Sequence, residues 1–166
     1  MKNFVFVFAV TALLVAGCKP ALQPLSERDR SAAAALSSEA SFAINLREWD
    51  RAEKLLLQAI KITPAPEFYH NLGSVRMRAG QRAGAKDAYQ SAIDACERLF
   101  AADKTNTGLL LKKVQLLALL GRRDEARTFL AKLDKDYAKD PAVRAFVDAK
   151  RLDEVMASPL FKEIAL

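Results

Sequence analysis

Three segments of the chain repeat one pattern of small and bulky apolar residues, and this pattern limits the possible folds more than any other feature. In each segment an alanine is followed by a bulky residue four positions later and by a small or apolar residue three positions after that. Two antiparallel helices approach closely only where both offer a small residue at their crossing. We therefore expect each segment to pack against the helix that precedes it. The aligned sets are Ala52, Leu56 and Ala59; Ala85, Tyr89 and Ala92; and Ala126, Leu130 and Leu133, with Ala40, Gly73 and Val114 twelve positions before each alanine.

Helical periodicity continues from residue 26 to the C-terminus, and we find no strand pattern. Apolar residues recur at steps of three and four, in a composition dominated by Ala, Leu, Lys, Arg and Glu. Ser26, Asp140-Pro141 and Ser158-Pro159 have the residue types that begin helices. Gly80 and Gly121 lie where the first helix of a pair must end, a position that favours a left-handed backbone.

The middle segment, YHNLGSVRMRAGQRAGAKDAYQSAI at residues 69–93, resembles the tetratricopeptide repeat (TPR), a helix–turn–helix unit of about 34 residues. The first copy departs from the consensus with Arg47 at the usual glycine, and the third with Lys113 and Val114 in place of Leu-Gly. The consensus positions of the middle copy hold Tyr69, Leu72, Gly73, Gly80, Ala85, Tyr89 and Ala92.

The resemblance covers roughly residues 33–140 and implies an all-α, TPR-like α-solenoid of about three helix pairs. We expect the repeats to occupy residues 26–140 and C-terminal capping helices to occupy residues 141–166. The spacing from Ala85 to Ala126 is 41 residues, which is seven more than the unit of about 34. A longer second helix would preserve the packing face, because seven residues are close to two helical turns. The alternative is a longer loop around residues 101–107, and we expect some of each.

Apolar side chains at both ends of the solenoid have expected roles. A solenoid needs an atypical last unit to cover its final apolar face, and the C-terminal helices supply candidates. Phe42 and Trp49 are expected to close the hydrophobic core of the first pair. The residues expected to cover the last face are Leu152, Val155, Phe161 and Ile164.

The chain begins with an uncharged apolar run at residues 4–17, preceded by Lys2. A helix that spans a bilayer needs about 20 apolar residues, so the run has the layout of a signal peptide instead. Its end, VAGC at residues 15–18, resembles the lipobox of bacterial lipoproteins. That resemblance implies covalent diacylglycerol and an N-acyl lipid on Cys18. The alternative is a buried N-terminal helix with a chance cysteine, but the run lacks the polar face of such a helix.

Under this interpretation residues 1–17 are a lipoprotein signal peptide and residues 18–25 are a lipidated tether. Lipoproteins that carry aspartate after the cysteine tend to stay at the inner membrane of Gram-negative bacteria, and here that position is Lys19. The resemblance therefore implies a location at the outer membrane, facing the periplasm. A Gram-positive host would place the protein on the outer face of its single membrane.

The sequence offers no constellation for catalysis. His70 is the only histidine, which excludes a two-histidine metal site, and neither a GxSxG motif nor a glycine-rich phosphate loop occurs. We expect no enzyme activity, no metal and no other cofactor. The formal net charge of +6 is scattered rather than clustered with aromatics, which disfavours nucleic-acid binding. Cys96 follows an apolar helical pattern and is expected to be a buried thiol.

The TPR resemblance also implies a concave groove, lined by the first helix of each pair, that binds an extended peptide or a partner helix. Polar side chains at these positions suit hydrogen bonding to a partner, and His70 among them would make binding sensitive to pH. The alternative is that they are only the solvated side of amphipathic helices. The residues at groove positions are Ser37, Ser41, Asn45, His70, Asn71, Ser74, Arg78, Lys112 and Gln115.

These features predict a membrane-anchored lipoprotein adaptor that binds a protein or peptide partner within an envelope assembly. Secretin pilotins and members of outer-membrane assembly complexes are examples of such proteins. One alternative is a regulator or docking subunit for a cell-wall enzyme, and another is a self-associating structural spacer. The sequence leaves the oligomeric state and the identity of the partner open.

Overall fold

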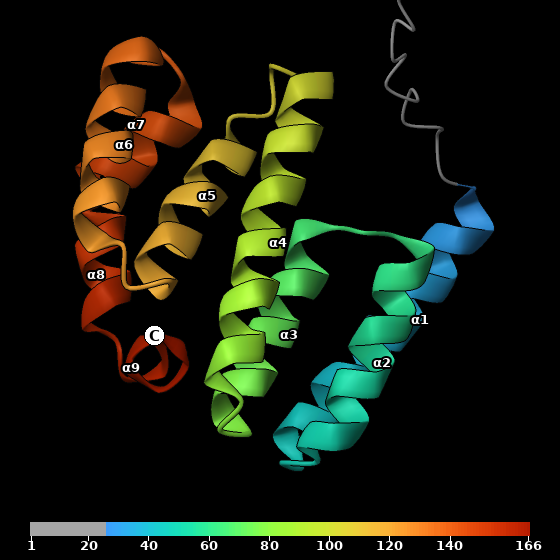
Figure 1. Cartoon of the computed structure of the whole chain (residues 1–166). Helices are drawn as coiled ribbons and strands as arrows, with labels where there is room; N and C mark the ends of the chain where they lie inside the picture. The colour runs from blue at the N-terminus through green and yellow to red at the C-terminus, as the bar shows by residue number, and fades with distance from the viewer. Residues whose placement is uncertain (1–25) are drawn as a thin grey trace, which may run out of the picture.

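The computed structural model describes residues 26–166, which contain nine α-helices and no strand (Figure 1). The all-α class predicted from the periodicity is confirmed. The signal peptide, Cys18 and the tether lie outside the described residues. The helices are α1 (Glu27–Asn45), α2 (Trp49–Ile62), α3 (Pro66–Arg78), α4 (Arg82–Ala102), α5 (Gly108–Leu119), α6 (Arg123–Asp136), α7 (Pro141–Asp148), α8 (Arg151–Ala157) and α9 (Pro159–Ile164).

The first six helices form three antiparallel pairs that stack side by side, α1 with α2, α3 with α4 and α5 with α6 (Figure 1). The predicted crossing residues lie inside these pairs. Ala40, Ala52, Ala85, Val114 and Ala126 have no exposed surface. Because the partner helix is so close at these positions, side chains larger than the native ones have no space there.

In the middle pair, Gly73 of α3 faces Tyr89 of α4. A Cβ atom added at Gly73 would lie 2.3 Å from the Tyr89 ring. Tyr89 itself is fully buried. The glycine is therefore required by packing and not by its backbone conformation, because it lies inside a regular helix.

The three turns within the pairs share one backbone geometry. Gly80 and Gly121 have φ angles of 79° and 74°, as predicted for a left-handed helix end, and Arg47 occupies the same place in the first pair with a φ of 60°. In each turn, the amide of the residue after the left-handed one donates to the carbonyl five residues before it, in the first helix of the pair. In the first pair, the Glu48 amide donates to the Ala43 carbonyl at 2.9 Å. This is the Schellman ending, in which glycine is the favoured residue.

Helix α4 accommodates the seven-residue excess between the second and third repeats. It has 21 residues, whereas α2 and α6 have 14 each. The difference of 21 − 14 equals the excess, so two extra turns of helix preserve the packing face of α4. The loop that follows, residues 103–107, is two residues longer than the one at residues 63–65.

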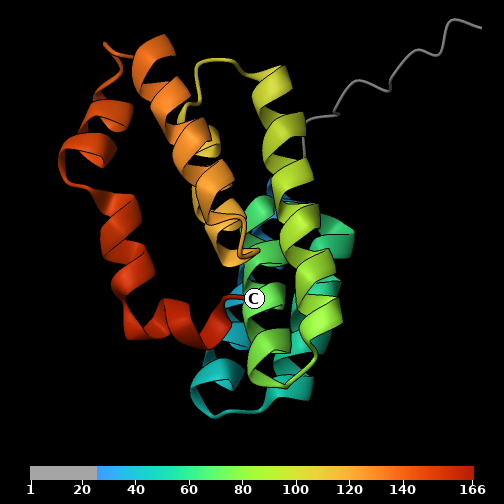
Figure 2. The same cartoon turned by 60° about the vertical axis from the view of Figure 1, so that its left-hand side comes forward.

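The C-terminal helices turn back along the stack instead of only closing its end. Helix α7 packs on α5 and α6, α8 packs on α5, and α9 reaches α3 (Figure 2). Three of the four predicted covering residues, Leu152, Phe161 and Ile164, are buried, and Val155 is partly buried. They cover the side of the solenoid formed by α3 and α5, which corrects the expectation that they cover only the last face.

The prediction that Phe42 helps to close the first core is wrong, because its side chain is 59% exposed. Ala40 and Ala43 face α2, and Phe42 lies about 200° around the helix from Ala40. Trp49 is only partly buried, at the start of α2. Within the described residues, no helix combines the length and apolar character needed to cross a membrane.

Candidate functional site

The predicted groove residues lie on α1, α3 and α5, and the structure divides them into three groups. Ser37 and Ser41 lie on α1, where the Ser41 hydroxyl donates to the Ser37 carbonyl at 3.0 Å. Asn45 and Arg78 line an open cleft at the lower end of α1 and α3. The others, His70, Asn71, Ser74, Lys112 and Gln115, lie on α3 and α5 and are partly or fully buried.

Residues 151–166, here called the C-terminal segment, cover the inner face at α3 and α5. Phe161 and Ile164 are buried there. With His70 and Gln115 they line a cavity of about 230 Å³. The Tyr89 hydroxyl donates to the Ile164 carbonyl at 2.7 Å, and the Leu166 amide donates to the Leu119 carbonyl at 2.8 Å. The middle of the predicted groove is therefore occupied by the chain itself.

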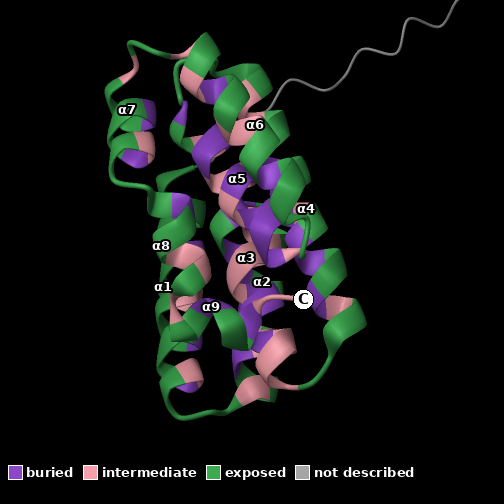
Figure 3. Cartoon of the chain, turned by 90° about the vertical axis from the view of Figure 1, so that its left-hand side faces the viewer, coloured by how far each residue is buried: buried purple, intermediate pink, exposed green. Residues whose placement is uncertain are grey.

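Helix α5 shows the effect of this cover most clearly. Most of its residues are buried (Figure 3), because α4 and α6 enclose it on two sides and α7 and α8 on another. Its groove positions Lys112 and Gln115 keep only part of their surface. A partner that bound along α5 would first have to displace the C-terminal segment.

Burial also sets the protonation state of His70. It lowers the pKa of His70 to about 4, and the positive charge of Lys112 contributes further. His70 is therefore neutral at neutral pH, so it does not make the covered face pH-sensitive there. Between about pH 6.5 and pH 4 the unfolded chain binds a proton that the folded chain does not, so stability falls as the pH falls through this window. The loss is roughly 2 kcal/mol, since the imidazole keeps some contact with solvent.

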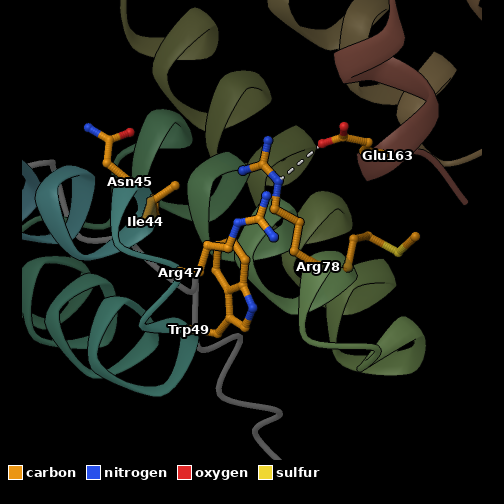
Figure 4. A pocket seen from close by; sticks show the side chains of 7 residues that line it. Ile44, Asn45, Arg47, Trp49, Arg78 and Glu163 are labelled. Carbon is orange, nitrogen blue, oxygen red and sulfur yellow. Dashed lines mark ion pairs between the residues drawn. The ribbon is translucent and has the colours of Figure 1, made fainter.

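The open cleft lies where the turn between α1 and α2 faces the C-terminal end of α3 and helix α9 of the C-terminal segment. It has a volume of about 630 Å³ and is lined by Ile44, Asn45, Arg47, Trp49, Met77, Arg78 and Glu163 (Figure 4). The Arg78 guanidinium lies 5.9 Å from the centroid of the Trp49 ring. Its Nε lies 3.6 Å from Oε2 of Glu163. The cleft thus combines an aromatic wall with two guanidinium groups.

Asn45 and Arg78 of this cleft were predicted as binding residues from the sequence, whereas Arg47 and Trp49 were not. A signal for Arg47 was present, because arginine stands where the other two repeats have glycine. Trp49 was predicted to close the core of the first pair, and it does pack against that core while part of its side chain stays exposed to the cleft.

Two features of the described residues bear on metal binding and on thiol reactivity. Between residues 26 and 166 no group of three or more His, Cys, Asp or Glu side chains is placed to hold a metal ion. Cys96 is buried, as predicted, and burial raises the pKa of its thiol to about 11. At that pKa the thiol is protonated and unreactive at neutral pH.

The family model of the tetratricopeptide repeat matches residues 77–149, from the end of α3 to α7. The fold is TPR-like. The TPR-like region is similar to the crystal structure of yeast Tom70, with 19% sequence identity and a TM-score of 0.41. The match covers 79% of this chain and 26% of the Tom70 chain, so the chain spans about a quarter of that protein. No curated protein matches the chain.

Proposed function

We propose that the protein is a lipid-anchored adaptor that holds a protein partner near a membrane of the cell envelope. A TPR-like solenoid suggests a protein-interaction scaffold, because its stacked helices present an extended inner surface. The proposal rests on one observation: part of this inner surface is covered by the chain itself, and part of it is open. The C-terminal segment covers α3 and α5, whereas the cleft beside Trp49 stays open.

The partner therefore binds at the end of the inner face formed by the first pair. This end contains Asn45 and Arg78, two of the nine groove residues predicted from the repeat positions. Aromatic and arginine side chains are enriched among the residues that carry binding energy at protein interfaces. Trp49 and Arg78 supply both kinds in one cleft.

The anchor rests on the sequence at residues 15–18, where the lipobox-like VAGC ends in Cys18. A lipid chain contributes about 0.8 kcal/mol per buried CH2, and several chains together anchor a protein stably. Lys19 supports a location at the outer membrane, facing the periplasm. In this arrangement residues 18–25 link the solenoid to the bilayer.

One experiment tests the lipid anchor and the adaptor function together. A photo-cross-linking residue replaces Asn45, both in the wild-type chain and in the Cys18→Ser variant. We expect a discrete adduct with a protein at Asn45, and incorporation of labelled palmitate that is lost in Cys18→Ser. The controls are a cross-linker at Lys86, which is exposed on α4, and the variant Cys96→Ser, which keeps the label. Equal adducts at both positions would contradict the adaptor site, and full labelling of Cys18→Ser would contradict the anchor.

A further inference from the structure

The turn between α1 and α2 keeps an arginine in a backbone conformation that favours glycine. Arg47 has a φ of 60°, and the chain's two equivalent turns have Gly80 and Gly121. A left-handed backbone brings the Cβ of any larger residue too close to the carbonyl oxygen, so Arg47 makes the turn less stable than glycine would. Strained backbone conformations cluster at functional sites. Lys150, before α8, shares this conformation with a φ of 50°, so the case for Arg47 rests on the cleft that its side chain enters.

The side chain of Arg47 extends into the cleft beside Arg78 (Figure 4). Trp49 lies against the Arg78 guanidinium, and this contact orients the planar group while its N–H edges stay available. Two guanidinium groups in one cleft repel each other unless an anion lies between or beside them. The pair therefore suits a ligand that brings carboxylates.

Glu163 shows which kind of group the cleft accepts. The short helix α9 brings its carboxylate to 3.6 Å from Arg78, although Glu163 is 62% exposed. A pair with one exposed partner at this distance contributes little stability, so a carboxylate from another molecule can replace Glu163. Arginine binds carboxylates well because its N–H groups match the two oxygens.

We propose that this cleft binds an acidic peptide segment of the partner protein, with Arg47 and Arg78 as the carboxylate-binding side chains. The inference rests on the proposed function and specifies the chemistry of the partner. Other acids border the arginines: Glu48 pairs with Arg51 at 2.9 Å, and Asp50 lines the adjoining hollow. These acids disfavour a flat anionic membrane surface, whereas single carboxylates of a peptide enter between them.

The test uses the full chain in detergent micelles and measures the fluorescence anisotropy of a labelled octapeptide that alternates glutamate with serine. We expect this peptide to bind and the matching lysine–serine peptide not to bind. Arg47→Gln and Arg78→Gln should each weaken binding about tenfold, because hydrogen bonds to charged groups are among the stronger ones. Arg98→Gln, at an exposed position on α4, is the charge-matched control and should leave binding unchanged.

The variant Arg47→Gly separates function from stability. It should weaken binding as much as Arg47→Gln does, yet raise the melting temperature by about 2–4 °C, because glycine fits the left-handed turn. A loss of binding in a more stable protein cannot come from misfolding. If Arg47→Gly and Arg78→Gln bind the acidic peptide as the wild type does, the inference is wrong.

Three further outcomes would also overturn the inference. Equal binding of the acidic and basic peptides would show that charge does not select the ligand. Phosphatidylglycerol in the micelles could displace the acidic peptide from the wild type but not from Arg47→Gln. That result would assign the cleft to a lipid phosphate. An adduct at Asn45 together with no acidic-peptide binding would leave the adaptor function standing and overturn only the acidic specificity.

Discussion

Replacing Gly73 with alanine is expected to destabilise the fold by about 3 kcal/mol, because the added methyl group overpacks a fixed interface. The new Cβ would lie 2.3 Å from the Tyr89 ring. The ring cannot move aside easily, because Tyr89 is fully buried and its hydroxyl donates to the Ile164 carbonyl. The crossing of α3 and α4 must then widen, which also disturbs the covered inner face.

Chemical denaturation of Gly73→Ala measures this loss, with Gly84→Ala as the matched control. The three atoms nearest to a Cβ at Gly84 all belong to the side chain of Arg76, the first at 3.1 Å. Glu53 and the Gly84 carbonyl hold this side chain, so it must give by a few tenths of an ångström, which costs far less than moving the buried Tyr89 ring. Because alanine favours helix over glycine by about 1 kcal/mol, Gly84→Ala should stay within about 1 kcal/mol of the wild type. Equal stabilities of the two variants would mean that α3 and α4 do not cross at Gly73.

Replacing Phe161 with alanine is expected to release the C-terminal segment while the three helix pairs stay folded. Truncation of a buried phenylalanine costs about 3–5 kcal/mol, and α9 has only six residues with which to offset the loss. The hydrogen bonds from Tyr89 to Ile164 and from Leu166 to Leu119 should open together, because both join this segment to the solenoid.

Hydrogen exchange of the Leu166 amide measures the release. It should be slow in the wild type, where the amide donates to Leu119, and fast in Phe161→Ala. Leu160→Ala is the control at the neighbouring residue, whose side chain is 55% exposed, and should leave the exchange slow. Unchanged slow exchange in Phe161→Ala would show that Phe161 does not hold the segment in place.

Local sequence signals predicted the repeat scaffold well. Small residues at fixed spacing predicted the crossings, because the close approach of two helices depends on a few neighbouring positions. The helix starts at Ser26, Asp140 and Ser158 were predicted from side chains that accept amide hydrogen bonds two or three residues later, and the structure contains those bonds.

The path of the C-terminal segment could not be predicted in the same way. Its apolar residues suit the last face of the solenoid as well as the inner face at α3 and α5. The choice depends on contacts between distant residues, such as the bond between Tyr89 and Ile164, which are 75 positions apart. Periodicity contains no information on such pairs, because it describes one helix at a time.

The candidate site was predicted only in part for a related reason. Repeat positions name residues on the first helices, so they include Asn45 and Arg78 but omit the turn between α1 and α2. Arg47 and Trp49 lie in that turn and at the start of α2. Whether a groove residue stays accessible also depends on the C-terminal segment, which partly covers His70 and leaves Asn45 exposed.

The most direct test of the central claim, that the C-terminal segment covers the inner face, is an NMR titration of His70. It is the only histidine, so its ring signal is unambiguous. We predict a pKa of about 4 in the wild type, with no titration between pH 8 and about pH 5, and a rise of the pKa toward the ordinary value in Phe161→Ala. A wild-type pKa near 6.5, the value of an exposed imidazole, would contradict the claim that the C-terminal segment covers the inner face.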